Sequence, residues 1–268
     1  MLRTLASTLA ALFLLALAAE AQVVTFTIPL EGSQEVPPVV SGGSGTATIT
    51  LDSATGSVTV SGSYTGLSGN QSVAHIHGAA AAGANAGVVL ALTGTGGTSG
   101  TISGSGVLNA ARTAEMLAGR HYVNVHSTAH PGGELRGQIC LPATVASRNA
   151  GANPVSYSAA PLVFGGSFNA TVDLSTTGHD FAFLLGFDTA VDVALGGGQR
   201  LLCLDLGGSG EVFSGAGLGP VPGPSANFSA PIPNDLAFCN FTFCSQAVHI
   251  GGVAPFALSN AQDVTVGF

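Results

Sequence analysis

The sequence has no lysine and no tryptophan, and only 7% of its 268 residues are charged. Six arginines stand against fourteen acidic residues, so the formal net charge is −8. A chain with so few cations cannot replace the counterions of a nucleic-acid backbone, which excludes a phosphate-tracking nucleic-acid binder. Intrinsic disorder is excluded too, because disordered chains are poor in apolar residues, whereas 46% of this chain is hydrophobic.

Residues 1–21 have the pattern of a secretory signal peptide. Arg3 supplies the positive start, residues 5–18 form an apolar run, and Ala19-Glu20-Ala21 is a small-x-small cleavage site. The run is too short to span a bilayer comfortably, and no second apolar stretch of membrane length follows. We therefore expect an exported protein with no membrane span after cleavage, located outside the cell, on its surface or in the periplasm.

The four cysteines fit an oxidising compartment. Cys140, Cys203, Cys239 and Cys244 are an even number with no CxxC pair, which favours two disulfides over a zinc ribbon. Three pairings are open. A straight strand would hold Cys239 and Cys244 about 16 Å apart, too far for a bond between them.

Alternating apolar and hydroxyl residues, broken by Gly-rich turns, predict an all-β protein. A change in composition near residue 140 divides the chain into two β-sandwich domains, residues 22–140 and 156–268, with a Pro-bounded linker at 141–155. In the first domain we expect strands at 23–30, 45–51, 57–64, 73–77, 88–92, 101–107, 121–126 and 135–140. In the second we expect them at 164–174, 180–187, 200–206, 226–232, 238–250 and 263–268.

One short helix is expected in the first domain. Asn109 can cap it, residues 110–117 are rich in alanine, and Gly119 can end it.

Histidines form the most chemically informative pattern. His75 and His77 flank Ile76, and residues two apart on a strand share a face. If Ala74 and Ile76 face the core, both imidazoles point outward. The same parity places Tyr122, Asn124 and His126 outside. Should the two strands be neighbours, His75, His77 and His126 would form a three-histidine site suited to copper or zinc, with His130 as a weaker fourth ligand. The alternative is that these histidines only hold loops by hydrogen bonds.

Three charged residues lie in turn motifs near these histidines. Glu134 and Arg136 share a strand face after a Pro-Gly-Gly turn, which favours a structural ion pair between them. The alternative is that Arg136 steers an anion toward the histidines. Glu35 precedes Pro37-Pro38 and is an acidic ligand candidate, although a structural role is more usual there.

Several blocks carry a family resemblance. Residues 30–38 (LEGSQEVPP), 74–78 (AHIHG), 122–126 (YVNVH) and 131–139 (PGGELRGQI) resemble the CHRD domain, the module repeated in chordin. The resemblance spans about 115 residues and implies an immunoglobulin-like β-sandwich in an exported protein with no assigned activity.

The same blocks are similar to copper/zinc superoxide dismutase. That resemblance implies His75, His77 and His126 as copper ligands and Arg136 as an anion-guiding residue. Residues 78–87 (GAAAAGANAG) contain no ligand, so the zinc site of that enzyme should be missing and dismutase activity is not expected.

The second domain is similar to an unassigned β-rich module of exported planctomycete-like proteins, on cues such as Arg148-Asn149 and Pro231-Ile232-Pro233-Asn234. Two functions remain open. One is a non-catalytic exported module that binds an extracellular protein or surface component. The other is a copper- or zinc-binding protein with a three-histidine site, which could be redox-active. The sequence shows no nucleophile elbow, phosphate loop or dinucleotide signature, which favours a protein that is not an enzyme.

Overall fold

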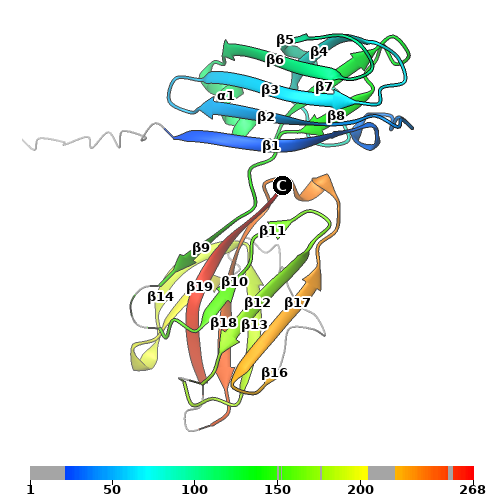
Figure 1. Ribbon diagram of the computed structural model, residues 1–268. Coiled ribbons are helices and arrows are strands. Elements are labelled where there is room, and N and C mark those ends of the chain that lie inside the picture. The colour runs from blue at the N-terminus through cyan, green and yellow to red at the C-terminus, as the bar shows by residue number, and fades with distance from the viewer. Residues whose placement is uncertain (1–21, 150, 152, 176, 205–220, 253–255) are drawn as a thin grey trace, which may run out of the picture.

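The computed structural model describes residues 22–149, 151, 153–175, 177–204, 221–252 and 256–268. The signal peptide expected at residues 1–21 lies outside them. Two β-rich domains follow one another along the chain (Figure 1). Among the described residues, no helix has the length and apolar character needed to cross a membrane.

The N-terminal domain is a closed eight-stranded barrel. Its strands are β1 (Val23–Glu31), β2 (Ser44–Asp52), β3 (Ser57–Thr65), β4 (Gln71–Gly78), β5 (Val88–Gly94), β6 (Gly100–Val107), β7 (His121–Ser127) and β8 (Leu135–Gln138). They pair in the order β1-β2-β3-β6-β5-β4-β7-β8. The ring closes where Glu31 of β1 pairs with Arg136 of β8. The all-β prediction is confirmed, but the two-layer sandwich expected for this domain is corrected to a barrel.

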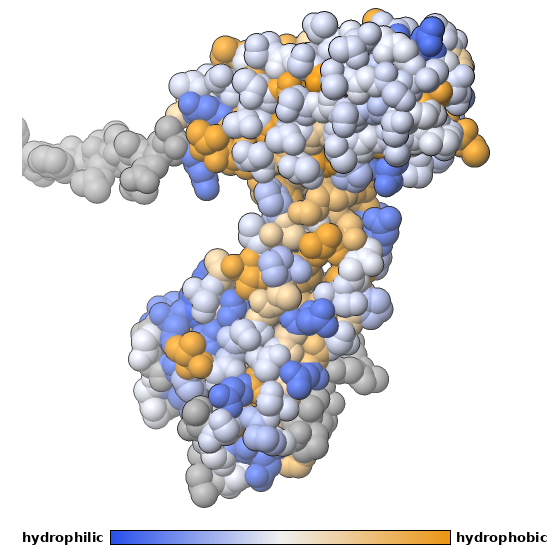
Figure 2. Space-filling view, viewed as in Figure 1, coloured by the Kyte–Doolittle hydropathy of each residue, from blue (hydrophilic) through white to orange (hydrophobic). Residues whose placement is uncertain are grey.

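Alternation along the strands fills the barrel interior. Phe26, Ile28 and Leu30 of β1 are all 0% exposed, while their neighbours on the strand face outward. The expected helix is present as α1 (Ala110–Leu117), and the Asn109 side chain accepts a hydrogen bond from the Arg112 amide at 2.9 Å. The outer surface is weakly polar rather than charged, as Figure 2 shows by its pale colours over this domain. The hydroxyl-rich strands account for this surface.

The described residues of the C-terminal domain form three further sheets. Their strands are β9 (Thr144–Arg148), β10 (Tyr157–Ala159), β11 (Leu162–Val163), β12 (Ser167–Asp173), β13 (Phe181–Phe187), β14 (Thr189–Ala194), β15 (Arg200–Leu204), β16 (Val221–Pro222), β17 (Ser225–Pro231), β18 (Thr242–Ile250) and β19 (Phe256–Gly267). One sheet has the order β10-β12-β17, a larger one the order β11-β19-β18-β13-β16 with β9 also on β19, and β14 pairs with β15. Phe168 and Phe228 from the first and Phe243 from the second belong to one core. Residues 141–155, which were expected to be a linker, supply strand β9 of the larger sheet.

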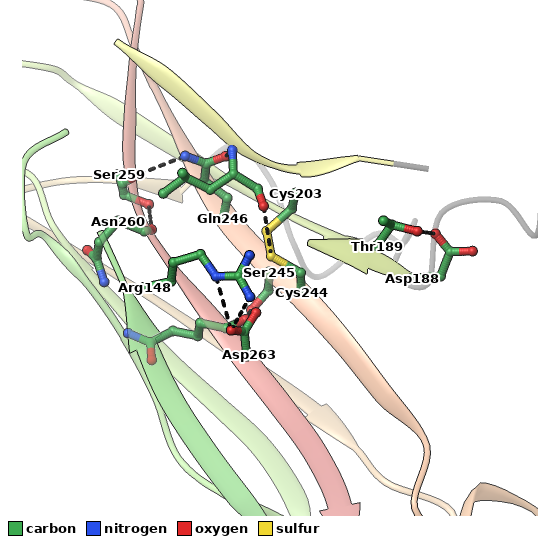
Figure 3. Close-up of a disulfide and its surroundings, with 12 residues drawn as sticks. Arg148, Asp188, Thr189, Cys203, Cys244, Ser245, Gln246, Ser259, Asn260 and Asp263 are labelled. Carbon is green, nitrogen blue, oxygen red and sulfur yellow. Dashed lines mark hydrogen bonds and ion pairs between the residues drawn. A yellow bond between two sulfur atoms is a disulfide. The ribbon is translucent and has the colours of Figure 1, made fainter. Parts of the chain in front are cut away.

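Two disulfides resolve the pairing that the sequence left open. Cys203 is bonded to Cys244, linking β15 to β18. Around this bond, Figure 3 shows Gln246 reaching the Ser259 carbonyl, at 2.8 Å, and Arg148 paired with Asp263.

The other disulfide, Cys140–Cys239, ties the end of the barrel to the second domain. Next to it, Asn240 donates to the Leu117 carbonyl at 2.7 Å and accepts from the Leu141 amide at 2.6 Å. Asn240 thus serves both α1 and the connecting segment. Apolar surface gathers between the two domains in Figure 2, and Phe268 packs against both cores.

Candidate metal centre

Strands β4 and β7 are neighbours, which is the condition on which the histidine site depended. Their register places His75 opposite Asn124 and His77 opposite Tyr122. Ala74, Ile76 and the two valines of β7 are 0% exposed in the core, so the polar residues between them lie on the outer face. Because both strands follow this parity, side chains from β4 and β7 form one polar layer outside the barrel wall.

The three histidines meet in this layer. His75, His77 and His126 each offer one ring nitrogen, and these atoms all lie within 4.8 Å of one another. The ring centroids are 5.4 Å apart for His75 and His77 and 5.2 Å apart for His75 and His126. His77 and His126 are 9% and 8% exposed, whereas His75 is more accessible.

Backbone carbonyls orient two of the rings. The Nδ1 atom of His77 lies 3.0 Å from the Ala86 carbonyl, and Nδ1 of His126 lies 2.9 Å from the Pro131 carbonyl. A carbonyl only accepts, so both Nδ1 atoms carry the hydrogen, and on a neutral ring the Nε2 atom then presents the lone pair. The Nε2 atom of His77 is buried without a hydrogen-bond partner. That of His126 is 3.3 Å from Nδ1 of His75.

The surroundings keep two of the ligand candidates neutral. Burial lowers the pKa of His75, and repulsion from His126 lowers it further. Burial also lowers the pKa of His77; the Ala86 hydrogen bond opposes this, while His75, His126 and Arg136 add to it. A neutral imidazole is the form that binds a metal ion.

A stack of three side chains supports His77 from behind. The Tyr122 ring lies parallel to the His77 ring, with centroids 5.0 Å apart. The Arg136 guanidinium covers the other face of Tyr122, 3.6 Å from the ring centroid. Arg136 is 1% exposed and donates to the Ala84 carbonyl at 2.9 Å and to Gln138 at 2.8 Å. The guanidinium therefore fastens the loop that also holds His77, and at 1% exposure it does not face the solvent from which an anion would be steered.

Glu134 does not form the ion pair expected with Arg136. Its carboxylate instead accepts hydrogen bonds from the Ser41 hydroxyl at 2.6 Å, the Ser68 amide at 2.6 Å and the Ser127 hydroxyl. Burial raises the pKa of this carboxyl, but the three donors outweigh burial and hold it below its ordinary value. Glu134 thus ties two loops and the end of β7 together as a buried anion.

The remaining histidines of this domain are not part of the three-histidine group. His130, the weaker candidate, shapes the turn through its backbone: its amide donates to the Ser127 hydroxyl at 3.1 Å and its carbonyl accepts from the Gly133 amide at 3.1 Å. His121 is 0% exposed, and its ring lies against Gly78, where a Cβ atom would come within 2.4 Å of it.

Glu35 occupies the same polar layer, beyond Asn124. It is 5% exposed, and its Oε2 atom accepts from Asn124 Nδ2 at 3.4 Å. Burial raises the pKa of Glu35 to about 7, although the charge of Arg136 and the Asn124 bond work against the rise. Glu35 is therefore not part of the three-histidine group, but it borders its supporting layer.

Two contributors were not recognised from the sequence. Tyr122 was placed on the outer face, but nothing in its spacing signalled a ring stacked between His77 and Arg136. The Ala86 carbonyl belongs to an Ala/Gly-rich loop that carries no side-chain signal at all.

Comparison with known proteins gives one match. Residues 26–139 match the family model of the CHRD domain. Neither the curated proteins nor the solved structures contain a match to this chain.

Proposed function

Residues 26–139 belong to the CHRD domain family, and we propose that the protein is an exported, non-catalytic binding module whose CHRD domain binds a copper or zinc ion through His75, His77 and His126. The observation that carries the proposal is the convergence of three ring nitrogens within 4.8 Å, two of them with their lone pairs set by backbone carbonyls. Backbone carbonyls that accept a hydrogen bond from one ring nitrogen typically orient histidines whose other nitrogen binds a metal ion.

The chemistry of the group favours copper, then zinc. It consists of imidazoles alone, which suit both ions, and copper(II) binds nitrogen ligands more tightly than zinc does. Zinc–nitrogen bonds of about 2.0–2.1 Å require ligand atoms about 3.4 Å apart in a tetrahedral site. The His75–His126 pair already meets this spacing at 3.3 Å, so only His77 has to move inward.

His75 has to change its tautomer when an ion binds. In the structure its Nδ1 hydrogen points at Nε2 of His126, because His126 uses its own Nδ1 hydrogen for the Pro131 carbonyl. Moving that hydrogen to Nε2 frees the third lone pair. His75 is the most accessible of the three rings, so solvent can exchange this proton.

Metal analysis of the chain from residue 22 onward tests the proposal. After removal of metal and reconstitution with Cu²⁺ or Zn²⁺, we expect one ion per chain, measured by elemental analysis and calorimetry. His77→Ala and His126→Ala should abolish stoichiometric binding. His130→Ala is the matched control and should bind like the wild type.

Three results would contradict the proposal. Wild type that binds neither ion removes the metal-binding function and leaves a module for an extracellular protein or surface component. Equal binding by the His75→Ala/His77→Ala double variant places the ion elsewhere. Turnover of superoxide that is lost in His126→Ala would instead make the protein a redox enzyme.

A further inference from the structure

Two buried oxygen atoms beside the candidate metal centre have no hydrogen-bond partner. They are Oε1 of Glu35 and Oδ1 of Asn124. Glu35 is 5% exposed and Asn124 is 3% exposed, so solvent does not satisfy either atom from outside. A buried acceptor without a donor is costly, and two together call for a specific explanation.

The two oxygen atoms share one small space. A Cβ atom on Gly133 would lie 2.6 Å from Glu35 Oε1 and 2.6 Å from both Oδ1 and Nδ2 of Asn124. Meanwhile Asn124 Nδ2 donates to the other oxygen of the same carboxyl group, Oε2, at 3.4 Å. The Glu35 carboxyl and the Asn124 carboxamide therefore lie side by side. One hydrogen bond joins Nδ2 to Oε2, whereas Oε1 and Oδ1, which are both acceptors, have no hydrogen between them.

A single proton satisfies both orphaned atoms. Placed on Oε1 of Glu35, it donates to Oδ1 of Asn124 and completes a cyclic pair of hydrogen bonds between an acid and an amide. An ionised Glu35 has no hydrogen to offer and leaves both oxygen atoms without a donor. Rotating the Asn124 amide by 180° would only exchange which carboxyl oxygen accepts from Nδ2 and which one is left without a donor.

We propose that Glu35 is a proton-binding site: it carries a proton at neutral pH, shared with Asn124, and releases this proton when a divalent cation occupies the three-histidine site. The first part stands on the orphaned oxygens alone. The release rests on the proposed function.

The charges around Glu35 agree with a proton that is held but can be displaced. Arg136, from β8, is the charged group that acts on it and favours the ionised form, while burial favours the protonated one. His75 and His77 from β4 and Tyr122 and His126 from β7 complete the titratable groups of the layer. Burial lowers the pKa values of His75 and His77, which favours the neutral form of both rings.

An ion in the three-histidine site adds positive charge on the far side of Asn124. His75 lies opposite Asn124 in the β-ladder, and His126 is two residues along β7. Side chains in these positions are about 5–7 Å apart, which places the ion about 10 Å from the Glu35 carboxyl. A doubly charged ion at that distance should lower the apparent pKa of Glu35 by about two units.

Infrared difference spectroscopy on metal-free protein tests the first part. Near pH 6 ordinary carboxyl groups are ionised, so a carbonyl stretch of a protonated carboxylic acid should come from Glu35. We expect this band in the wild type and in E31Q, a control at the exposed glutamate that ends β1, and no band in E35Q. The amide of E35Q can form the same cyclic pair, so this variant should fold. No band in the wild type, or a band that survives in E35Q, overturns the assignment.

Addition of Zn²⁺, which is redox-silent, tests the release. At a pH near 7 the band should weaken in the wild type as the ion binds, and it should persist in His126→Ala. Binding without any change in the band refutes the release. If no zinc binds and the apo band is present, the proposed metal function fails while the proton site stands, so the two failures are distinguishable.

Discussion

Replacing Glu134 by glutamine should destabilise the N-terminal domain in a way that depends on pH. The carboxylate is 0% exposed and accepts from Ser41, Ser68 and Ser127. In Glu134→Gln, the amide oxygen can still accept from Ser41 and Ser68, which both donate to Oε1 in the wild type. The amide nitrogen replaces Oε2, so the Ser127 hydroxyl has to accept instead of donating. Loss of charge from these hydrogen bonds should cost about 2 kcal/mol at pH 7.

The sign of the pH effect follows from the depressed pKa of Glu134. Because hydrogen bonds lower this pKa below its ordinary value of 4.5 in the folded protein, the carboxylate stabilises the fold fully above that value. The contribution is lost as the pH falls through the folded pKa. The difference between wild type and Glu134→Gln should therefore shrink in acid.

Urea denaturation followed by tyrosine fluorescence measures this difference, since Tyr64 and Tyr122 report on the barrel. The exposed Glu31→Gln is the matched control and should change the free energy of unfolding little. A loss below about 0.5 kcal/mol at pH 7, or a loss that stays the same in acid, would refute the role given to Glu134.

Three further changes test other parts of the structure. Gly133→Ala should cost about 2–4 kcal/mol, because its φ is 131° and a Cβ atom would lie 2.6 Å from Glu35, whereas Gly132→Ala, with nothing within 4 Å, should unfold like the wild type in urea. The Cys140→Ser/Cys239→Ser pair removes a bond between residues 99 apart and should lower the denaturation midpoint by the equivalent of roughly 4–5 kcal/mol; an unchanged midpoint would contradict this. Burial, then repulsion from His179, lowers the pKa of His249 to about 4, so C-terminal stability should fall by about 2 kcal/mol as the pH drops from about 6.5 toward 4, and calorimetry should find that fall flattened in His249→Gln.

The strands and the helix could be predicted because their signals are local. Alternation along β1–β3 and the Asn109 cap each lie within a few residues of the element that they specify. Barrel closure could not be predicted in the same way. It depends on the contact of Glu31 with Arg136, more than 100 residues apart in the chain, and nothing in either strand's own pattern distinguishes an open sheet from a closed one.

The histidine group shows the same division. Parity on β4 and β7 was enough to put the three imidazoles on one outer face, and it needed only the adjacency of the two strands. The ion pair predicted between Glu134 and Arg136 is wrong, because opposite charge was the only guide to their partners. In the folded chain, distant loops bring Ser41 and Ser68 to Glu134 and the Ala84 carbonyl to Arg136. Such loop contacts have no periodic signal.

The scarcity of charge changes how these buried groups should be understood. The chain has six arginines and fourteen acids, and it buries Arg136 at 1%, Glu134 at 0% and Glu35 at 5% exposure around one set of strands. Burying a charge is costly unless its hydrogen bonds are complete. Arg136 and Glu134 meet this condition with backbone and hydroxyl partners, and each fixes loops that border the histidines.

Glu35 is the group that does not meet the condition as an anion. Apart from Oε1 of Glu35, Oδ1 of Asn124 and Nε2 of His77, hydrogen bonds and ring stacking hold this polar layer rigid, so a change at the three-histidine site has few ways to relax. Moving one proton between Glu35 and solvent is the smallest of them, because it requires no displacement of Arg136, Tyr122 or the loop that holds His77. The same rigidity means that the histidine rings should keep nearly the same positions with and without an ion, apart from the inward shift of His77.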